Sequence, residues 1–142
     1  MKKYRQIILL CTLFAFVTTA CKKEEELPTK PAPQWAVDAN SGYYVTMTAV
    51  VKIPENLSPY ADKNDQLAAF IGNECRGIGV AKNGLFLVPI KGSPEEQGAI
   101  HFSYYSARNK YLYKTNSIGT FEVDKMYGTV DNPIKLSLEI IK

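Results

Sequence analysis

Apolar and polar side chains alternate with a period of two along much of the chain after residue 42. Every second residue of YYVTMTAVV (43–51) is apolar, namely Val45, Met47, Ala49 and Val51. Strict alternation is typical of a strand with one buried face. The segment IKLSLEII (134–141) has the same period, and we expect Leu136, Leu138 and Ile140 to face inward.

Short turn signals separate further apolar segments. Gly72-Asn73 lies between LAAFI and CRGIGVA, and Asn83-Gly84 lies between GVAK and LFLVPI. These dipeptides supply the positive φ angles that two-residue hairpins need. The Arg108-Asn109 connection joins AIHFSYYSA (99–107) to KYLYKT (110–115), and IGTFEV (118–123) adds a shorter strand.

About eight strands, with turns roughly every 8–12 residues, predict an all-β fold. The expected architecture is a single β-sandwich, immunoglobulin-like in the broad sense. No segment after residue 34 has a long helical period, and SPEEQG (93–98) offers at most one helical turn. Pro89 lies late in its segment, which predicts an edge or a bulge there because proline cannot donate to a ladder.

The N-terminus predicts export. A basic start, MKKYRQ, precedes an apolar run at 7–17 and the small residues TTA, which together are typical of a signal peptide over residues 1–20. The apolar run is shorter than the ~20 residues that cross a bilayer. Ala20 suits an ordinary signal peptidase, but Cys21 at the next position resembles the lipidated cysteine of a bacterial lipobox, with Thr18 where that motif usually has leucine.

The residues after Cys21 strengthen the prediction of a lipid anchor. The run Lys23 to Glu26 resembles the export signal of surface lipoproteins in Bacteroidetes-type bacteria. This resemblance implies an outer-membrane lipoprotein exposed at the cell surface. A solvated spacer is the alternative for the charged run, and the choice between inner and outer leaflet stays open.

Composition limits what the domain can be. The proline-rich segment KKEEELPTKPAPQ (22–34) predicts a flexible tether after Cys21, so 21–34 precede a domain at 35–142. Removal of residues 1–20, with Lys2, Lys3 and Arg5, leaves 14 Lys and Arg against 14 Asp and Glu. No basic footprint for nucleic acid is expected. Cys75 is the one cysteine left in the domain, so an internal disulfide is excluded and the core must hold the fold.

Catalytic signals are sparse. The single histidine, His101, lies in an expected strand, the acids are scattered, and no nucleophile, zinc or phosphate motif occurs. We therefore expect no enzyme and no cofactor. The register set by Gly72-Asn73 pairs Phe70 with Cys75 and Ala68 with Gly77, which predicts that Cys75 is a small core residue. Arg76 is expected on the opposite face, paired with Glu74 or Asp65.

Two groups of residues remain as candidate ligand sites. ADKNDQL (61–67) brings Asp62, Asn64 and Asp65 into one loop, a weak calcium candidate that an Asx turn explains equally well. The stronger candidate is aromatic. Alternation places Tyr105 opposite the core, and Tyr111 and Tyr113 share a face of the next strand. We expect an exposed row of these three rings, suited to a glycan or a protein partner.

The pattern D-x-L-A-A-F-x-G-x-x-C-R-G (65–77) is the most specific part of a resemblance that covers Tyr44 to Ile134. The chain resembles a small accessory β-sandwich domain found in secreted and surface proteins of Bacteroidetes-type bacteria. This resemblance implies a non-catalytic module, and we expect binding of a glycan or an extracellular protein. The alternatives are a structural subunit of a surface assembly and, less favoured, a hydrolase.

Overall fold

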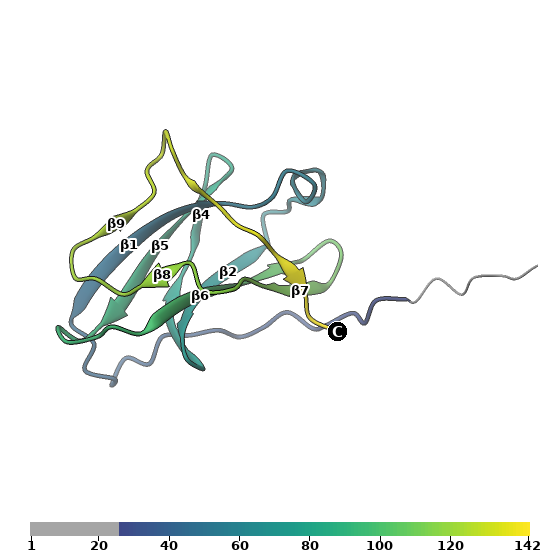
Figure 1. Ribbon diagram of the computed structural model, residues 1–142. Coiled ribbons are helices and arrows are strands. Elements are labelled where there is room, and N and C mark those ends of the chain that lie inside the picture. The colour runs from purple at the N-terminus through teal and green to yellow at the C-terminus, as the bar shows by residue number, and fades with distance from the viewer. Residues whose placement is uncertain (1–25) are drawn as a thin grey trace, which may run out of the picture.

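Two β-sheets pack against each other in the computed structural model, which describes residues 26–142 (Figure 1). The first sheet has the order β10-β1-β5-β4, and β9 also pairs with β1. Its strands are β1 (Val45–Lys52), β4 (Val80–Lys82), β5 (Leu85–Gly92), β9 (Met126–Tyr127) and β10 (Ile134–Lys135). The described residues contain no α-helix, only a 3-10 turn, η1 (Ser58–Tyr60).

The second sheet has the order β11-β7-β6-β2-β3, and β8 pairs with β6. Its strands are β2 (Gln66–Ile71), β3 (Glu74–Ile78), β6 (Ala99–Ser106), β7 (Tyr111–Lys114), β8 (Gly119–Thr120) and β11 (Glu139–Ile140). The predicted all-β sandwich is therefore confirmed. Within residues 26–142, no helix is long and apolar enough to cross a membrane.

The core lies between the sheets, where the alternating residues were expected to meet. From β1 it receives Met47, Ala49 and Val51, each at most 1% exposed. From β6 it receives three fully buried side chains, Ile100, Phe102 and Tyr104. Apolar side chains of β5 complete the contact, namely Phe86, Val88 and Ile90.

Both predicted two-residue turns are confirmed. Gly72 has φ 59° between β2 and β3. Asn83 has φ 52° and Gly84 has φ 77° between β4 and β5, as a type I′ turn requires. The connection from β6 to β7 spans 107–110, and its positive φ lies at Lys110 (57°).

The chain changes sheet at Gly79. The overlapping segments CRGIGVA and GVAK (75–82) were expected to form one continuous stretch of strand, but β3 pairs with β2 in one sheet and β4 pairs with β5 in the other. A Cβ on Gly79 would lie 3.1 Å from Phe86 Cδ1, and one on Gly77 would lie 2.3 Å from the Pro89 carbonyl oxygen. Because Gly77 and Gly79 have no side chains, β3 can pass close to β5 at this corner.

The register of the β2–β3 hairpin is partly as expected. Phe70 pairs with Cys75, which confirms that prediction. Ala69 rather than Ala68 pairs with Gly77, because the register shifts between Ala69 and Phe70. The shift is a bulge, in which one strand carries an extra residue that periodicity alone does not reveal.

The C-terminal strand was expected to be continuous and is instead divided. β10 runs parallel to β1 in one sheet, whereas β11 pairs with β7 in the other. Leu136, between them, is 4% exposed, which confirms its inward orientation. The expected strand at 118–123 is reduced to β8, after which Phe121 is buried (2% exposed).

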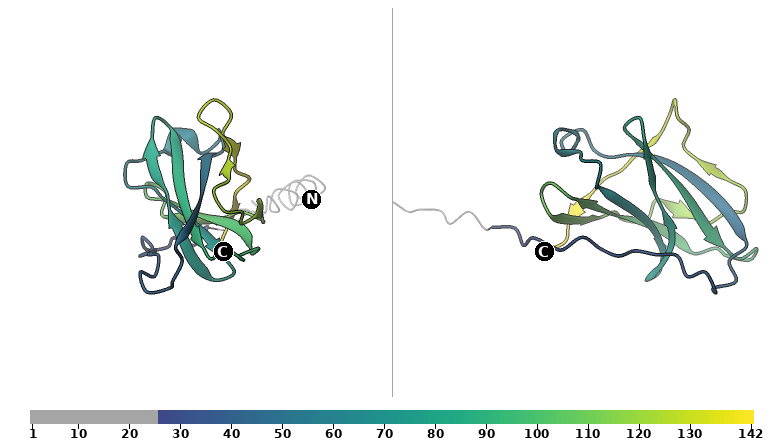
Figure 2. Two further views of the ribbon diagram at one scale, coloured as in Figure 1. Left: turned by 90° about the vertical axis from the view of Figure 1, so that its left-hand side faces the viewer. Right: turned by 180° about the vertical axis from the view of Figure 1, so that it is seen from behind.

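The segment before β1 lies along the outer face of the second sheet (Figures 1 and 2). The Lys30 backbone N–H donates to the Lys110 carbonyl at 2.8 Å. The Tyr105 hydroxyl donates to the Lys30 carbonyl at 3.3 Å. The Trp35 ring meets Phe70 edge to face, with centroids 5.9 Å apart. Residues 30–43 are called the N-terminal strap below, because they hold to the domain along their length.

Candidate functional site

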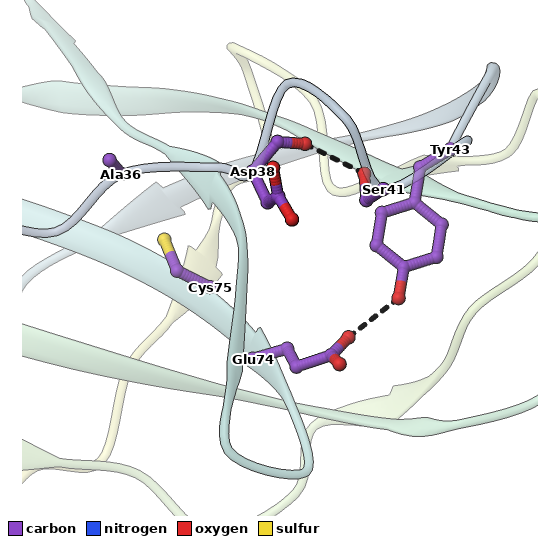
Figure 3. A pocket seen from close by; sticks show the side chains of 6 residues that line it. All are labelled: Ala36, Asp38, Ser41, Tyr43, Glu74 and Cys75. Carbon is purple, nitrogen blue, oxygen red and sulfur yellow. Dashed lines mark hydrogen bonds between the residues drawn. The ribbon is translucent and has the colours of Figure 1, made fainter.

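A pocket of about 440 Å³ opens between the N-terminal strap and the beginning of β3 (Figure 3). Four lining residues come from the strap and two from β3, and we call it the Tyr43–Glu74 pocket. The lining residues are Ala36, Asp38, Ser41, Tyr43, Glu74 and Cys75. The pocket is of the size that small ligands occupy in proteins, which is roughly 300–1,000 Å³.

A tight turn in the strap sets the position of Asp38. Its side chain accepts a hydrogen bond from the Asn40 backbone N–H at 2.9 Å. Its carbonyl accepts from the Ser41 hydroxyl at 2.7 Å, and Gly42 follows with φ 73°. An aspartate that bonds the backbone two residues ahead is typical of an Asx turn. Figure 3 shows the Asp38 carboxylate directed into the hollow.

Tyr43 and Glu74 close the opposite side of the pocket. The Tyr43 hydroxyl donates to Glu74 Oε2 at 2.6 Å. This bond, followed by the nearby charge of Arg76, lowers the pKa of Glu74 below its ordinary value. The same bond raises the pKa of Tyr43. At neutral pH the wall therefore presents a carboxylate beside a protonated phenol.

Arg76 supports this wall from below. Its guanidinium carbon lies 3.6 Å from the centre of the Tyr43 ring. Nη2 lies 3.1 Å from Glu74 and 3.0 Å from Glu96, and Nη1 donates to the Lys91 carbonyl at 3.3 Å. The pairing with Glu74 confirms one of the two expected partners, and Asp65 is not involved. Arg76 is only 5% exposed, so its positive charge interacts with these partners in the wall and not with solvent.

Cys75 lies half-buried beneath the strap instead of in the core between the sheets. It shares the outer face with Phe70, and the strap covers that face. Burial raises the pKa of its thiol, and its sulfur makes only a long contact of 3.8 Å to the Gly77 carbonyl. A raised pKa disfavours the thiolate, so the residue is a poor nucleophile.

The prediction of a row of exposed tyrosines is wrong. Tyr105 is only 5% exposed because the N-terminal strap covers it, which the prediction of a free tether did not allow for. Tyr113 pairs with Tyr104 and Tyr111 pairs with Ser106, so both belong to the core-facing side of β7. Tyr105 therefore lies on the outer face of the sheet, and Tyr111 and Tyr113 lie on its core-facing side.

The loop at 62–65 is a turn held by its own side chains. Asp62 Oδ1 accepts from the Asn64 N–H at 2.8 Å, and Asp65 Oδ2 accepts from the Asp62 N–H at 2.9 Å. Asp65 also accepts from the Tyr104 hydroxyl at 2.6 Å and the Ala107 N–H at 2.8 Å. These bonds engage both carboxylate oxygens of Asp65 and one of Asp62, as in an Asx turn. Residues 26–142 hold no group of three or more His, Cys, Asp or Glu arranged for a metal.

His101 packs against an aromatic neighbour. Its ring stacks on Phe70 with centroids 5.6 Å apart, and desolvation lowers its pKa. Cys21, the predicted lipidation site, lies outside the described residues.

The sequence analysis did not predict the side of the pocket that the N-terminal strap forms. The run DANSG (38–42) is rich in turn-forming residues and could have marked a built turn. Its contact with β3 is a matter of long-range packing, for which the local pattern gives no signal.

The chain was compared with protein-family models, with curated proteins and with solved structures, and none of the three comparisons found a match. The resemblance to a Bacteroidetes-type accessory domain therefore stays a prediction.

Proposed function

We propose that this protein is a non-catalytic binding module of a bacterial cell surface, held at the outer membrane by lipid on Cys21, and that it binds a glycan in the Tyr43–Glu74 pocket. The observation that carries the proposal is the arrangement of the pocket walls. Carboxylates of Asp38 and Glu74 face one hollow, with a hydroxyl of Ser41 beside them (Figure 3).

Sugar hydroxyls are hydrogen-bond donors, and carboxylate oxygens are strong acceptors for them. The Tyr43 ring, Ala36 and Cys75 supply apolar surface between these acceptors. A pocket with apolar walls and a few placed polar groups is the usual form of a small-ligand site. A glycan satisfies both features at once, because its hydroxyls can donate to Glu74 Oε1 and Asp38 Oδ2, whereas Glu74 Oε2 and Asp38 Oδ1 already accept hydrogen bonds within the protein.

A glycan array with the mature protein identifies the ligand, and titration calorimetry with the best hit tests the pocket. We expect Asp38→Asn and Glu74→Gln each to weaken binding about tenfold, since a hydrogen bond to a charged acceptor contributes ~1.5–3 kcal/mol. The matched controls are Asp131→Asn and Glu55→Gln, two exposed carboxylates outside the pocket. Equal affinity in all four variants would exclude this site.

A basic peptide is the competing ligand for a pocket with two carboxylates. The salt dependence of the affinity distinguishes a basic peptide from a neutral glycan. Binding of a neutral glycan should change little between low and high ionic strength, whereas an ion pair at an exposed site weakens strongly with salt. Loss of affinity in high salt would favour a protein partner over a glycan.

A second candidate function is a structural subunit that docks through a strand edge. The observation that favours it is the exposure of Ile78 (38%) and Val80 (63%) on either side of Gly79, where β3 and β4 are edge strands of their sheets. Exposed edges can pair with another chain. Light scattering of wild type against Val80→Lys tests it: association that the lysine abolishes supports the assembly, and a concentration-independent monomer contradicts it.

A further inference from the structure

Residues 30–41, which form most of the N-terminal strap, lie on the domain with little burial. None of them is buried, and seven are exposed to solvent. Within the described chain, 26–142, residues 36–42 form hydrogen bonds only with one another, in the turn that begins at Asp38. Segments with few buried contacts open locally at a lower free energy than the core does.

Two attachments hold this part of the strap on the second sheet. At its start, Lys30 bonds Lys110 through its backbone N–H and Tyr105 through its carbonyl. In its middle, the Trp35 ring packs edge to face on Phe70. Both attachments lie before the pocket, so the strap side of the pocket depends on contacts made outside it.

The strap is held much more firmly after Gly42. The Tyr43 hydroxyl bonds Glu74, and the Tyr43 ring lies over the buried guanidinium of Arg76. Gly42 separates this fixed part from residues 30–41. It has φ 73°, and a Cβ placed there would meet nothing within 4 Å. A glycine in open space can absorb a backbone rotation without a clash, as hinge residues do.

Two carboxylates face each other across the pocket, one from each part of the strap's surroundings. Figure 3 shows Asp38 on the strap side and Glu74 on the β3 side. The pKa of Glu74 is lowered, first by the Tyr43 hydrogen bond, but the charge of Asp38 acts on it in the opposite sense. The two negative charges therefore repel each other, and this repulsion opposes closure of the strap.

We propose that residues 30–41 are a movable wall of the Tyr43–Glu74 pocket, which moves away from β3 about Gly42 while the two sheets stay folded. The packing of Trp35 holds the wall closed, and the repulsion between the two carboxylates favours opening. Opening widens the pocket and uncovers Cys75, which lies beneath the strap. That this movement admits a glycan rests on the proposed function, whereas the movement itself does not.

The test uses the chain that begins at position 21, with Cys21→Ser, so that Cys75 is the one thiol left. Hydrogen exchange followed by NMR measures opening at the Lys30 amide, and alkylation by N-ethylmaleimide measures exposure of Cys75. The Phe102 amide, which donates to the buried Thr115 hydroxyl, reports global unfolding. After correction for intrinsic rates, we expect the Lys30 amide to exchange at least about 100-fold faster than the Phe102 amide.

Trp35→Ala should accelerate Lys30 exchange and Cys75 alkylation by the same factor, about fivefold, because an edge-to-face aromatic pair is lost. The matched control is Tyr44→Ala, which removes a ring that is 78% exposed and lies beyond the hinge. It should leave both rates unchanged. A Lys30 amide that still exchanges faster than the Phe102 amide shows that the Trp35 variant is folded.

Asp38→Asn should act in the opposite direction and slow both rates about twofold, as expected for one pair of exposed charges. The asparagine oxygen can still accept the Asn40 N–H, so the turn is kept. Asp131→Asn, which removes an exposed carboxylate outside the pocket, should change neither rate.

Three results would overturn the proposal. Equal exchange of Lys30 and Phe102 would mean that the strap opens only when the whole domain unfolds. Faster exchange of Lys30 in Trp35→Ala without faster alkylation of Cys75 would mean that only the start of the strap frays. Unchanged or faster opening in Asp38→Asn would remove the role of repulsion. No glycan is used in these measurements, so their failure is distinct from a failure of the calorimetric test of the pocket.

Discussion

Arg76 is the side chain on which most contacts at the pocket converge. It is 5% exposed and bonds two carboxylates and a carbonyl, with the Tyr43 ring over its guanidinium. A charge buried to this degree is tolerated only when its partners are in place. The same residue thus pairs with Glu96, holds Glu74 at the pocket wall and bonds the Lys91 carbonyl in β5.

Replacement of Arg76 by alanine should destabilise the fold. Loss of one partner of a buried ion pair costs ~3–5 kcal/mol, and we reduce this to about 2–3 kcal/mol because the Glu74 side chain is 63% exposed. Urea unfolding measures the change. Arg108→Ala is the matched control and should alter stability by no more than ~0.5 kcal/mol, as at other exposed sites. Equal effects of the two changes would contradict the role assigned to Arg76.

Acidification should weaken the Tyr43–Glu74 contact in a defined window. The folded-state pKa of Glu74 lies below its ordinary value of 4.5. The stability that the ionised Glu74 adds to the folded state is therefore fully present above pH 4.5. This stability is lost as the pH falls through the folded-state pKa. Thermal midpoints of wild type and Glu74→Gln, measured from pH 7 downward, should converge below that window. Curves that stay parallel would mean that this carboxylate does not couple to folding.

At the scale of elements, hairpins were the most predictable features. Asn83-Gly84 and Gly72-Asn73 act locally, so the sequence alone identifies them. The switch of sheets at Gly79 was missed because it depends on contacts with Leu67 and Phe86, which are distant in sequence. The short parallel strand β9 was missed for the same reason, since its partner is β1.

Substitution of Gly84 isolates the backbone contribution of a hairpin. Nothing lies within 4 Å of a Cβ placed there, and φ is +77°, so any cost arises from the backbone and not from a clash. Gly84→Val should destabilise the protein by ~1–3 kcal/mol. Gly84→Asn, which tolerates positive φ, should cost less. Chemical denaturation of both variants checks the order, and equal stability would place the strain elsewhere.

At the scale of the whole molecule, the N-terminal strap explains why the candidate site could not be predicted. Periodicity placed Tyr105 correctly on the outer face, as its neighbour Tyr104 is core. For Tyr105 the error was to equate the outer face with solvent, whereas Tyr111 and Tyr113 lie on the core-facing side. A proline-rich segment with few apolar residues gives no local sign that it will pack, yet Trp35 and Lys30 bind it to the sheet.

Removal of part of the strap should therefore change stability without abolishing the fold. We expect residues 35–142 to unfold cooperatively, because the core lies between the sheets. Their thermal midpoint should be lower than that of residues 22–142, because Tyr105 loses the cover of Lys30. Calorimetry of the two chains decides the point. Identical midpoints would show that the contacts of Lys30 contribute nothing, and a non-cooperative transition would show that the fold requires them.

The most direct measurement is an NMR titration of the isotope-labelled mature protein with the best ligand from the glycan array. The proposed function predicts chemical-shift changes concentrated in residues 36–43 and 74–75, which line the Tyr43–Glu74 pocket. At a ligand concentration near the wild-type dissociation constant, Glu74→Gln should reduce these changes several-fold, in line with its weaker binding, and Glu55→Gln should leave them intact. Shifts confined to β6 and β7, or to the loop at 58–65, would contradict the assignment of this pocket as the binding site.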